Sequence, residues 1–273
     1  MTYDLTPDLI GRDLPTAVVG RPLVVHAQVG STNDLVRQQA RAGQPEGLVV
    51  LAEEQTAGRG RMGRGWAAPP GSSLLLSLLL RPDWLLPADS FALTMLAGVA
   101  LCEAVEQAAP LRAALKWPND LMLPVAGASE PALRKSAGIL SEIELAGDQI
   151  AWVVVGMGVN VNWAPQGFVD GRDLAEVATS VAAAAGREID RLALLRALLV
   201  RLDERYALLR QGRREELFDA WRGRLATLGQ PVDVRLPQRE LRGTAEGVEP
   251  SGALLVRDEA GILHTVVAGD VDV

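Results

Sequence analysis

An arginine–glycine segment at residues 57–66, AGRGRMGRGW, is the strongest candidate for chemistry in this sequence. It places three arginines among four glycines and ends on Trp66. Ordered glycine costs conformational entropy and neighbouring guanidinium groups repel one another, so we expect an anion to order the segment. Converging backbone N–H groups and flanking guanidiniums would bind that anion. The alternatives are an ordinary flexible loop or an RNA-binding tail, but the segment lies between two apolar strands.

The lysines form a second candidate, because the chain has 25 arginines and only two lysines, Lys116 and Lys135. Codon bias accounts for their scarcity. An ammonium is nevertheless a compact charge and a guanidinium a planar fork of donors, so we expect the remaining lysines where arginine cannot substitute. Lys116 belongs to KWPND, in which Pro118 fixes a turn that projects Asn119 and Asp120. These groups could neutralise a phosphate, read a base or ribose, or orient a metal ion. The alternative is a turn without function.

Lys135 stands in RKSAGILSE, shortly before Gly138, which permits close backbone approach. A lysine at the head of an apolar strand is ordinarily a solvated strand end, but its rarity here favours a functional interpretation. The segment GMGVNVN at residues 156–162 has Val161 where a dinucleotide fingerprint needs its third glycine, and Pro165 keeps a helix from opening after it. This excludes a Rossmann site. A P-loop is excluded because neither lysine follows a glycine.

The remaining composition argues against several other classes of protein. Two isolated histidines, His26 and His264, and one cysteine, Cys102, give little support for a zinc enzyme or a Ser-His hydrolase and exclude an intrachain disulfide. A net charge of −7 without a long basic run argues against nucleic-acid binding. The acidic N-terminus lacks the pattern of a signal peptide, and the longest apolar run, SSLLLSLLL, is about half of a membrane span. We expect a cytoplasmic protein without membrane attachment.

The order of helical and strand-like segments indicates an α+β fold. STND at residues 31–34 predicts the start of a helix that ends at Gly43. GLVVLAEEQ predicts a strand, and SSLLLSLLL predicts a buried strand between breakers. Residues 89–109 predict a buried helix, and LKWPNDLML, KSAGILSEIEL and QIAWVVVGMGVNVN predict strands. Residues 173–226 predict helices whose many arginines form a solvated face.

Short alternating runs after Gly229 predict a small β-barrel-like module. A module of that size buries too little apolar surface alone, so it should pack on the larger part of the chain. We therefore predict a central mixed or antiparallel sheet flanked by helices in a catalytic domain of residues 1–226. A small domain of residues 227–273 follows it.

Taken together, the motifs STND, EEQTAGRGRMGRGW, KWPND, KSAGILSE and GMGVNVN occur in an order that resembles the biotin protein ligase family. The resemblance implies a fold like that of class II aminoacyl-tRNA synthetases and biotin ligases, with an SH3-like C-terminal barrel. It implies an ATP-dependent reaction in which the carboxylate of biotin attacks the α-phosphate of ATP and forms biotinyl-5′-AMP and pyrophosphate. A lysine of a biotin carboxyl carrier protein, as in acetyl-CoA carboxylase, then accepts the biotin.

The resemblance also assigns roles to individual residues. Lys135, Arg61 and Asp120 would be catalytic, with Lys135 holding the carboxylate and α-phosphate oxygens and Asp120 orienting Mg²⁺ or the incoming lysine. Ser31, Thr32 and Gln55 would bind the ureido ring, Trp66 would wall the channel for the valeryl chain, and Asn160 would face adenosine. The full set of biotin-binding and ATP-binding positions is Ser31, Thr32, Asn33, Gln55, Gly58, Arg59, Gly60, Arg61, Arg64, Trp66, Lys116, Asn119, Gly138, Gly158 and Asn160.

The sequence departs from the family pattern in a few places. Met62 stands where some members have another arginine, Gly65 adds flexibility, and the hairpin before Lys135 is long. Only about 20 residues precede the first predicted core strand, fewer than a winged-helix DNA-binding domain needs, so we expect a ligase that does not bind DNA. Two subunits could pair through a sheet edge.

Two other functions remain open at this stage. A lipoate or octanoate ligase would share the fold, although polar groups at Ser31, Thr32 and Gln55 suit a urea-like head group better than a dithiolane. A binding protein without catalytic activity, either a biotin sensor or an RNA binder, is the rival from another class. The acidic charge and the few aromatic residues near the arginines argue against RNA.

Overall fold

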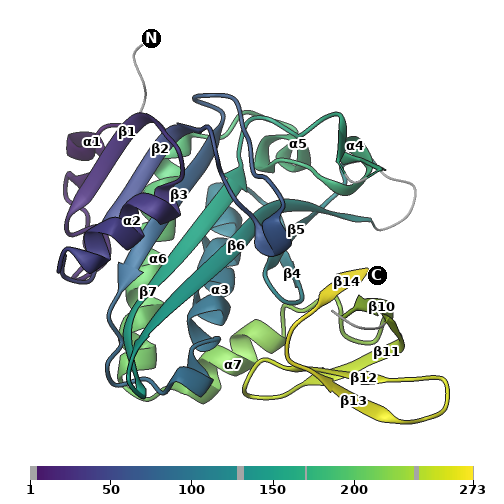
Figure 1. Ribbon diagram of the computed structural model, residues 1–273. Helices are drawn as coiled ribbons and strands as arrows, with labels where there is room; N and C mark the ends of the chain where they lie inside the picture. Colours follow the sequence, from purple (N-terminus) through teal and green to yellow (C-terminus); the bar gives the residue numbers. More distant parts are fainter. Residues whose placement is uncertain (1–4, 128–131, 170, 237–239, 273) are drawn as a thin grey trace.

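A seven-stranded sheet forms the centre of the protein (Figure 1). The computed structural model describes residues 5–127, 132–169, 171–236 and 240–272. The strand order is β1-β2-β3-β7-β6-β5-β4, in which β1 and β2 are parallel and every other neighbouring pair is antiparallel. The predicted mixed sheet is therefore confirmed. Its strands are β1 (Leu23–Val29), β2 (Val49–Gln55), β3 (Ser73–Leu80), β4 (Ala114–Lys116), β5 (Asp120–Pro124), β6 (Leu133–Ala146) and β7 (Gln149–Asn160).

Helices cover the two faces of the sheet unequally. On one face, the core joins the sheet to α3 (Ala92–Ala108), α6 (Arg191–Arg210) and α7 (Arg214–Arg222). On the other face, α2 (Thr32–Arg41) packs its apolar side on a smaller cluster of residues from β2, β3 and β7. The part of this second face that α2 leaves uncovered is where loops can place functional side chains.

Several short elements connect the larger ones. They are the helices α1 (Pro7–Gly11), α4 (Leu174–Val177) and α5 (Val181–Ala185), the 3₁₀ turns η1 (Arg61–Gly63) and η2 (Pro87–Asp89), and the two-stranded ribbon of β8 (Phe168–Val169) and β9 (Arg172–Asp173).

Helix α3 is a core helix, and every one of its residues from Ala92 to Cys102 is buried. Segment Pro87–Ala108 is long enough to cross a membrane, and its most apolar stretch of 18 residues has a mean hydropathy of 1.5, which is high enough. Yet 72% of that stretch is buried inside the protein. Strand β3 is equally enclosed, since all eight of its residues are buried between neighbouring strands and helices on both faces. The predictions of a buried helix and a buried strand for these segments are confirmed.

The C-terminal residues form a separate five-stranded antiparallel sheet of order β13-β12-β11-β10-β14, consistent with the SH3-like domain implied by the resemblance. It packs on the larger part of the chain, as expected. The indole Nε1 of Trp117 donates to the carbonyl of Gly252 at 2.8 Å, and Gly252 lies so close to Phe91 that a Cβ would overlap the ring. The strands are β10 (Pro231–Arg235), β11 (Glu240–Val248), β12 (Leu254–Arg257), β13 (Leu263–Val266) and β14 (Asp270–Asp272).

A buried ion pair joins α6 to the sheet. The guanidinium of Arg191 donates to both carboxylate oxygens of Glu53 at 2.9 and 3.0 Å, and to the carbonyl of Ser73 at 3.0 Å. Both charged side chains are only 2% exposed. The expectation that the arginines of residues 173–226 form a solvated face is therefore wrong for Arg191, because its partner lies on β2, far away in the sequence.

We predict that Glu53→Gln lowers the free energy of unfolding by about 3–5 kcal/mol, because it removes the carboxylate that accepts two hydrogen bonds from the buried Arg191 guanidinium. Urea denaturation measures the change. The matched control is Glu204→Gln, which removes the partner of Arg201 in an exposed pair and should cost at most about 1 kcal/mol. Equal losses in the two variants would contradict the prediction.

Candidate active site

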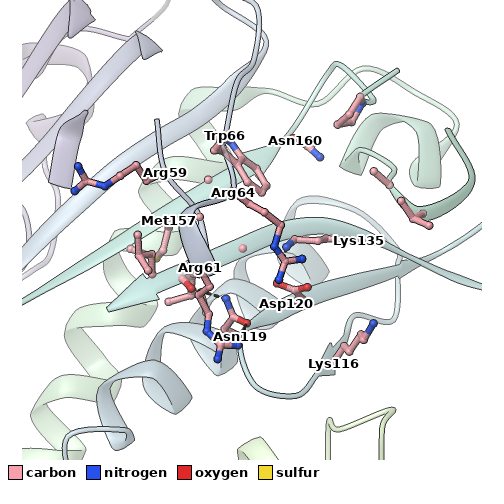
Figure 2. A pocket seen from close by; sticks show the side chains of 18 of the residues that line it. Arg59, Arg61, Arg64, Trp66, Lys116, Asn119, Asp120, Lys135, Met157 and Asn160 are labelled. Carbon is pink, nitrogen blue, oxygen red and sulfur yellow. Dashed lines mark hydrogen bonds and ion pairs between the residues drawn. The ribbon is translucent and has the colours of Figure 1, made fainter. Parts of the chain in front are cut away.

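One large cavity, of about 1860 Å³, lies between the open part of the sheet, the arginine–glycine loop and the C-terminal sheet (Figure 2). Side chains from segments far apart in the sequence converge on it. Every residue that the sequence analysis assigned to catalysis or ligand binding lines this cavity, namely Ser31, Thr32, Asn33, Gln55, Gly58, Arg59, Gly60, Arg61, Arg64, Trp66, Lys116, Asn119, Asp120, Lys135, Gly138, Gly158 and Asn160.

The floor of the cavity is flat because glycines stand where strands β6 and β7 would otherwise present side chains. Gly138 and Gly158 are direct register partners, and Asp120 on β5 pairs with Gly138 in the same row. The indole ring of Trp66 rests on this row, so closely that a Cβ at Gly158 would overlap it. The missing side chains therefore decide where Trp66 lies.

Lys135 and Asp120 meet above the same row. The Nζ of Lys135 lies 2.7 Å from the Oδ1 of Asp120 and 5.7 Å from the ring centroid of Trp66. Both groups are partly exposed to the cavity. A cation held between a carboxylate and an aromatic face is well placed to bind an oxyanion that enters the cavity.

The arginine–glycine segment is an ordered hairpin. The N–H of Trp66 donates to the carbonyl of Gly58 at 2.9 Å, and the N–H of Gly60 donates to the carbonyl of Arg64 at 2.7 Å. Met62 stands at the tip with φ 56° and is 68% exposed. The loop therefore presents backbone and guanidinium groups along its sides and an apolar side chain at its tip.

The three arginines of this hairpin have different partners. Arg61 donates to the Oδ1 of Asn119 and to the carbonyl of Gly269, each at 3.2 Å, while Arg64 pairs with Asp270 at 2.7 Å. Both thus connect the loop with the C-terminal sheet. Burial lowers the pKa of Arg61 from its ordinary value, although the guanidinium stays charged at neutral pH.

Arg59 points away from this group, toward α2 (Figure 2). Its guanidinium donates to both oxygens of Asp34 at 2.8 and 2.7 Å and lies 3.6 Å from Glu142. The hydrogen bond from Arg59 holds the pKa of the Asp34 carboxyl below its usual value. Arg59 is thus paired with two carboxylates, and its geometry is that of an anchor for the loop.

Lys116 lies at the opposite wall, where β4 turns into β5. Burial lowers the pKa of its ammonium, and the negative charges of Asp120, Asp272 and Asp270 partly offset that effect. The ammonium therefore faces carboxylates from both the central and the C-terminal sheet. A half-buried cation that forms no salt bridge with any described residue is a strong candidate for binding phosphate oxygens.

Apart from the Asp120 oxygen that forms the ion pair with Lys135, two buried polar atoms in the cavity wall have no hydrogen-bond partner within the described part of the chain. They are the indole Nε1 of Trp66 and the amide Oδ1 of Asn160. The amide nitrogen of Asn160 donates to the carbonyl of Thr179 at 3.1 Å, which fixes the orientation of the amide. The Trp66 donor and the Asn160 acceptor are thus available to a ligand in this part of the cavity.

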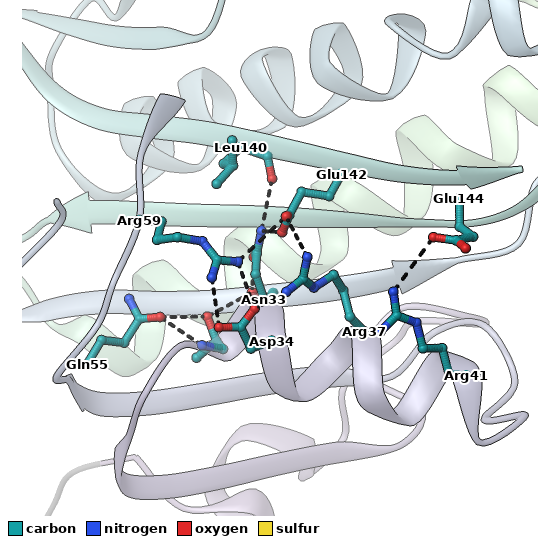
Figure 3. Close-up of polar contacts among 11 residues, drawn as sticks. Asn33, Asp34, Arg37, Arg41, Gln55, Arg59, Leu140, Glu142 and Glu144 are labelled. Carbon is teal, nitrogen blue, oxygen red and sulfur yellow. Dashed lines mark hydrogen bonds and ion pairs between the residues drawn. The ribbon is translucent and has the colours of Figure 1, made fainter. Parts of the chain in front are cut away.

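Polar residues at the start of α2 form the other end of the cavity (Figure 3). Gln55 accepts from the backbone N–H of Thr32 at 2.8 Å and from its hydroxyl at 3.1 Å. The amide nitrogen of Asn33 donates to Glu142 at 2.7 Å, and Arg37 donates to the same carboxylate at 3.2 Å. These contacts attach the start of α2 to β2 and β6.

Comparisons with known proteins agree with this geometry. Residues 25–160 match the profile of the biotin/lipoate A/B protein ligase family, and residues 227–273 match that of the biotin protein ligase C-terminal domain. A biotin–[acetyl-CoA-carboxylase] ligase of Mycobacterium tuberculosis is 34% identical over 278 residues, covering 98% of this chain and 96% of the relative. The chain belongs to the biotin protein ligase family.

Other members of the biotin protein ligase family support the same assignment. The bifunctional ligase/repressor BirA of Bacillus subtilis is 33% identical over 260 residues, which cover 95% of this chain and 76% of the relative. The biotin protein ligase of Aquifex aeolicus in complex with biotin and ATP superposes with a TM-score of 0.74 at 25% identity, covering 92% of this chain and 98% of that one. The Leishmania major enzyme in complex with biotinyl-5-AMP gives 0.57 at 26% identity, covering 90% and 98%.

Several residues that shape this site escaped the sequence reasoning. Glu142 accepts a hydrogen bond from Asn33 and forms ion pairs with Arg37 and Arg59. Asp270 in the C-terminal sheet forms an ion pair with Arg64. Alternation along KSAGILSE could have placed Glu142 on the same face as Gly138. Nothing in the sequence indicates Asp270, because its relation to the loop exists only after the C-terminal sheet has packed.

The hairpin before Lys135 and the two histidines are also the subject of predictions. The long hairpin before Lys135 includes residues 128–131, which lie outside the described residues, although the N–H of Val125 donates to the carbonyl of Ala132 at 3.0 Å on either side of them. Neither His26 nor His264 lines the large cavity. His264 is hydrogen-bonded to Asp258 at 2.7 Å in the C-terminal sheet, in keeping with the structural role expected for it.

We predict that Gly158→Ala displaces the Trp66 ring, because the added methyl group overlaps the indole on a strand that cannot move away from its neighbours. A crystal structure of the variant locates the ring, and thermal unfolding should show a cost of about 1–3 kcal/mol. Gly11→Ala is the control, since a Cβ there meets no heavy atom within 4 Å. An unmoved Trp66 in Gly158→Ala would refute the role of the glycine floor.

Proposed function

We propose that this chain is an ATP-dependent biotin protein ligase, which forms biotinyl-5′-AMP from biotin and ATP and then transfers biotin to a lysine of a carrier protein. The observation that carries the proposal is the convergence of Lys116, Lys135, Arg61 and Arg64 on one cavity that also contains a polar amide end at Gln55. A reaction between a carboxylate and a triphosphate needs such a cluster, because two anions must be held together.

The geometry supports distinct roles for these cations. Lys135 lies on the glycine floor beside Trp66, where the carboxylate of biotin would meet the α-phosphate. Lys116 and Arg64 stand nearer the C-terminal sheet and would bind the outer phosphates, with Asn160 receiving the adenosine end. The loop that carries Arg61 would cover the mixed anhydride and exclude water from it.

Asp120 is the carboxylate that would share Mg²⁺ with the phosphates of ATP. Among the described residues, no group of three His, Cys, Asp or Glu side chains could hold a metal ion. One carboxylate nevertheless suffices, because Mg²⁺ is commonly bound by one or two protein carboxylates together with substrate phosphates and water. The ion would neutralise phosphate charge, while Lys135 keeps Asp120 oriented toward the cavity.

Further parts of the proposal concern the cellular setting. The carrier would be the biotin carboxyl carrier protein of acetyl-CoA carboxylase or of a similar enzyme. Residues 1–226 would form the catalytic domain and residues 227–273 the small domain, whose Asp270 and Gly269 contact the loop. The buried single cysteine, Cys102, suits a reducing cytoplasm. Two subunits could associate through a sheet edge, and we propose no role in DNA binding.

The decisive test is incubation with biotin, labelled ATP and a carrier domain, followed by mass analysis of the carrier. We expect the mass increase of a single biotin. Lipoate is the alternative substrate, so ATP–pyrophosphate exchange with biotin and lipoate in competition tests the choice. Exchange supported by lipoate and not by biotin would overturn the proposal in favour of a lipoate ligase.

We predict that Lys135→Ala loses at least about 100-fold of the biotin-dependent ATP–pyrophosphate exchange, because a preorganised cation at the reacting oxygens is removed. Circular dichroism should show an intact fold. Arg134→Ala is the matched control, since it removes the neighbouring cation on β6, which does not line the cavity. Wild-type exchange in Lys135→Ala would refute the role assigned to this lysine.

We predict that Arg61→Gly releases biotinyl-5′-AMP faster than the wild type, because the loop loses its links to Asn119 and Gly269. Released adenylate reacts with exposed lysines, so biotin should appear on an unrelated protein such as serum albumin. Arg41→Ala, which removes an exposed cation at the end of α2, should leave retention unchanged. Unchanged labelling of albumin by Arg61→Gly would show that the loop does not retain the adenylate.

A further inference from the structure

Ser77 is the one polar residue within the run Leu74–Leu80 of the central strand β3, and its side chain is completely buried. It does not line the large cavity. A hydroxyl in such surroundings costs free energy unless it is hydrogen-bonded, so a leucine or an alanine would serve the core better. The contacts of Ser77 therefore call for an explanation that the core alone does not give.

The Ser77 hydroxyl holds the first turn of helix α2. Its Oγ lies 2.5 Å from the amide oxygen of Asn33 and 2.7 Å from the hydroxyl of Thr32, and its single proton is shared between these two acceptors. Gly156, the register partner of Ser77 on β7, makes room for Asn33, because a Cβ there would overlap the Asn33 amide. Two neighbouring strands are thus shaped to receive this one turn.

All hydrogen-bonding groups of the Asn33 side chain are used inside the protein. Its nitrogen donates to Glu142 at 2.7 Å and to the carbonyl of Leu140 at 3.4 Å, and its oxygen accepts from Ser77 (Figure 3). Only acceptors face the nitrogen and only a donor faces the oxygen, so the amide has one orientation. Asn33 consequently positions α2 and has no group left for a ligand.

This arrangement determines the orientation of Gln55. With Ser77 donating toward it, the Thr32 hydroxyl directs its own proton to the Oε1 of Gln55 at 3.1 Å, beside the Thr32 backbone N–H at 2.8 Å. Both donors hold the amide oxygen, and the amide nitrogen is turned away from them (Figure 3). Gln55 lines the cavity, and its nitrogen has no hydrogen-bond partner within the described residues.

We propose that Ser77 is a positioning residue that determines ligand specificity at a distance. Through Thr32 and Asn33 it fixes Gln55 so that the cavity wall donates hydrogen bonds to the head group of the ligand. This inference rests on the proposed function and deepens it. A head group with a carbonyl acceptor can accept a hydrogen bond from the Gln55 nitrogen in the wall. A head group with N–H donors at that position would place its donors against that nitrogen, which is itself a donor.

The test compares biotin with 2-iminobiotin, whose protonated imino group carries donors where biotin carries its carbonyl oxygen. Isothermal titration calorimetry at neutral pH gives the Kd of both ligands for the full chain and for Ser77→Ala. We expect the variant to bind biotin about tenfold more weakly. The Thr32 hydroxyl then turns to the unsatisfied oxygen of Asn33, so Gln55 is held by the Thr32 backbone N–H alone and less firmly. The wild-type orientation of Gln55 does not favour 2-iminobiotin, so the Kd of that ligand should stay within about twofold.

Ser141→Ala is the matched control. The Ser141 hydroxyl forms a comparable hydrogen bond with Thr94 of α3 at 2.9 Å, away from the cavity. This variant should lose stability and keep both Kd values. If Ser77→Ala does not fold, Ser77→Cys replaces it, because a thiol fills the space but is a weak donor. Ser77→Thr retains the hydroxyl and should keep the preference for biotin.

The outcomes separate this inference from the proposed function. Wild-type binding of biotin by Ser77→Ala and Ser77→Cys would overturn the role of Ser77, and so would equal weakening of both ligands or an equal effect of Ser141→Ala. Each of those results leaves the wild-type enzyme a biotin ligase. Failure of the wild-type chain to bind biotin at all would overturn the proposed function together with the inference.

Discussion

The site depends on a sheet surface without side chains where β6 and β7 cross the cavity. Gly138 and Gly158 form one register row and Gly156 stands in the next row on the same face, so the backbone itself is the floor. Trp66 lies on the first row and Asn33 enters the second, each at a distance that a Cβ would abolish. Because neighbouring strands fix the position of this floor, the loop and the helix that rest on it are fixed as well.

Charge is balanced locally around this floor. Arg59, Arg64 and Lys135 each pair with an aspartate, and these carboxylates come from α2, β14 and β5. Pairing lets several cations lie close together without the repulsion that a bare cluster would suffer. It also explains how a chain of net charge −7 can gather several cations around one pocket. Net charge describes the whole surface, while binding depends on the groups that face one cavity.

The loop has two kinds of attachment, which gives its two ends different mechanical roles. Arg59 fixes the beginning of the loop to α2, next to the amide end of the cavity. Arg61 and Arg64 contact Gly269 and Asp270, so the tip and the far limb belong with the C-terminal sheet. The small sheet therefore takes part in closing the cavity, and its packing through Trp117 and Gly252 bears on the site.

The sequence by itself determined the main elements and the chemical groups of the site. Apolar runs between breakers predicted β3 and α3, and the rarity of lysine pointed to Lys116 and Lys135, because these signals are local. Only the tertiary structure decided the partners. Arg191 looked like a surface residue until Glu53 was placed beside it, and Arg59 became an anchor because Asp34 and Glu142 lie within reach.

The physical reason is that a side chain's role depends on its nearest partner, and partners far apart in the chain meet only through packing. Ser77 shows this most clearly. A serine within a run of leucines indicates a buried polar group, but the sequence of the strand does not indicate that Thr32 and Asn33 are its acceptors. Local propensity and composition can therefore name the elements and the charged groups, while hydrogen-bond direction and burial become defined only once the sheet, helix and loop have come together.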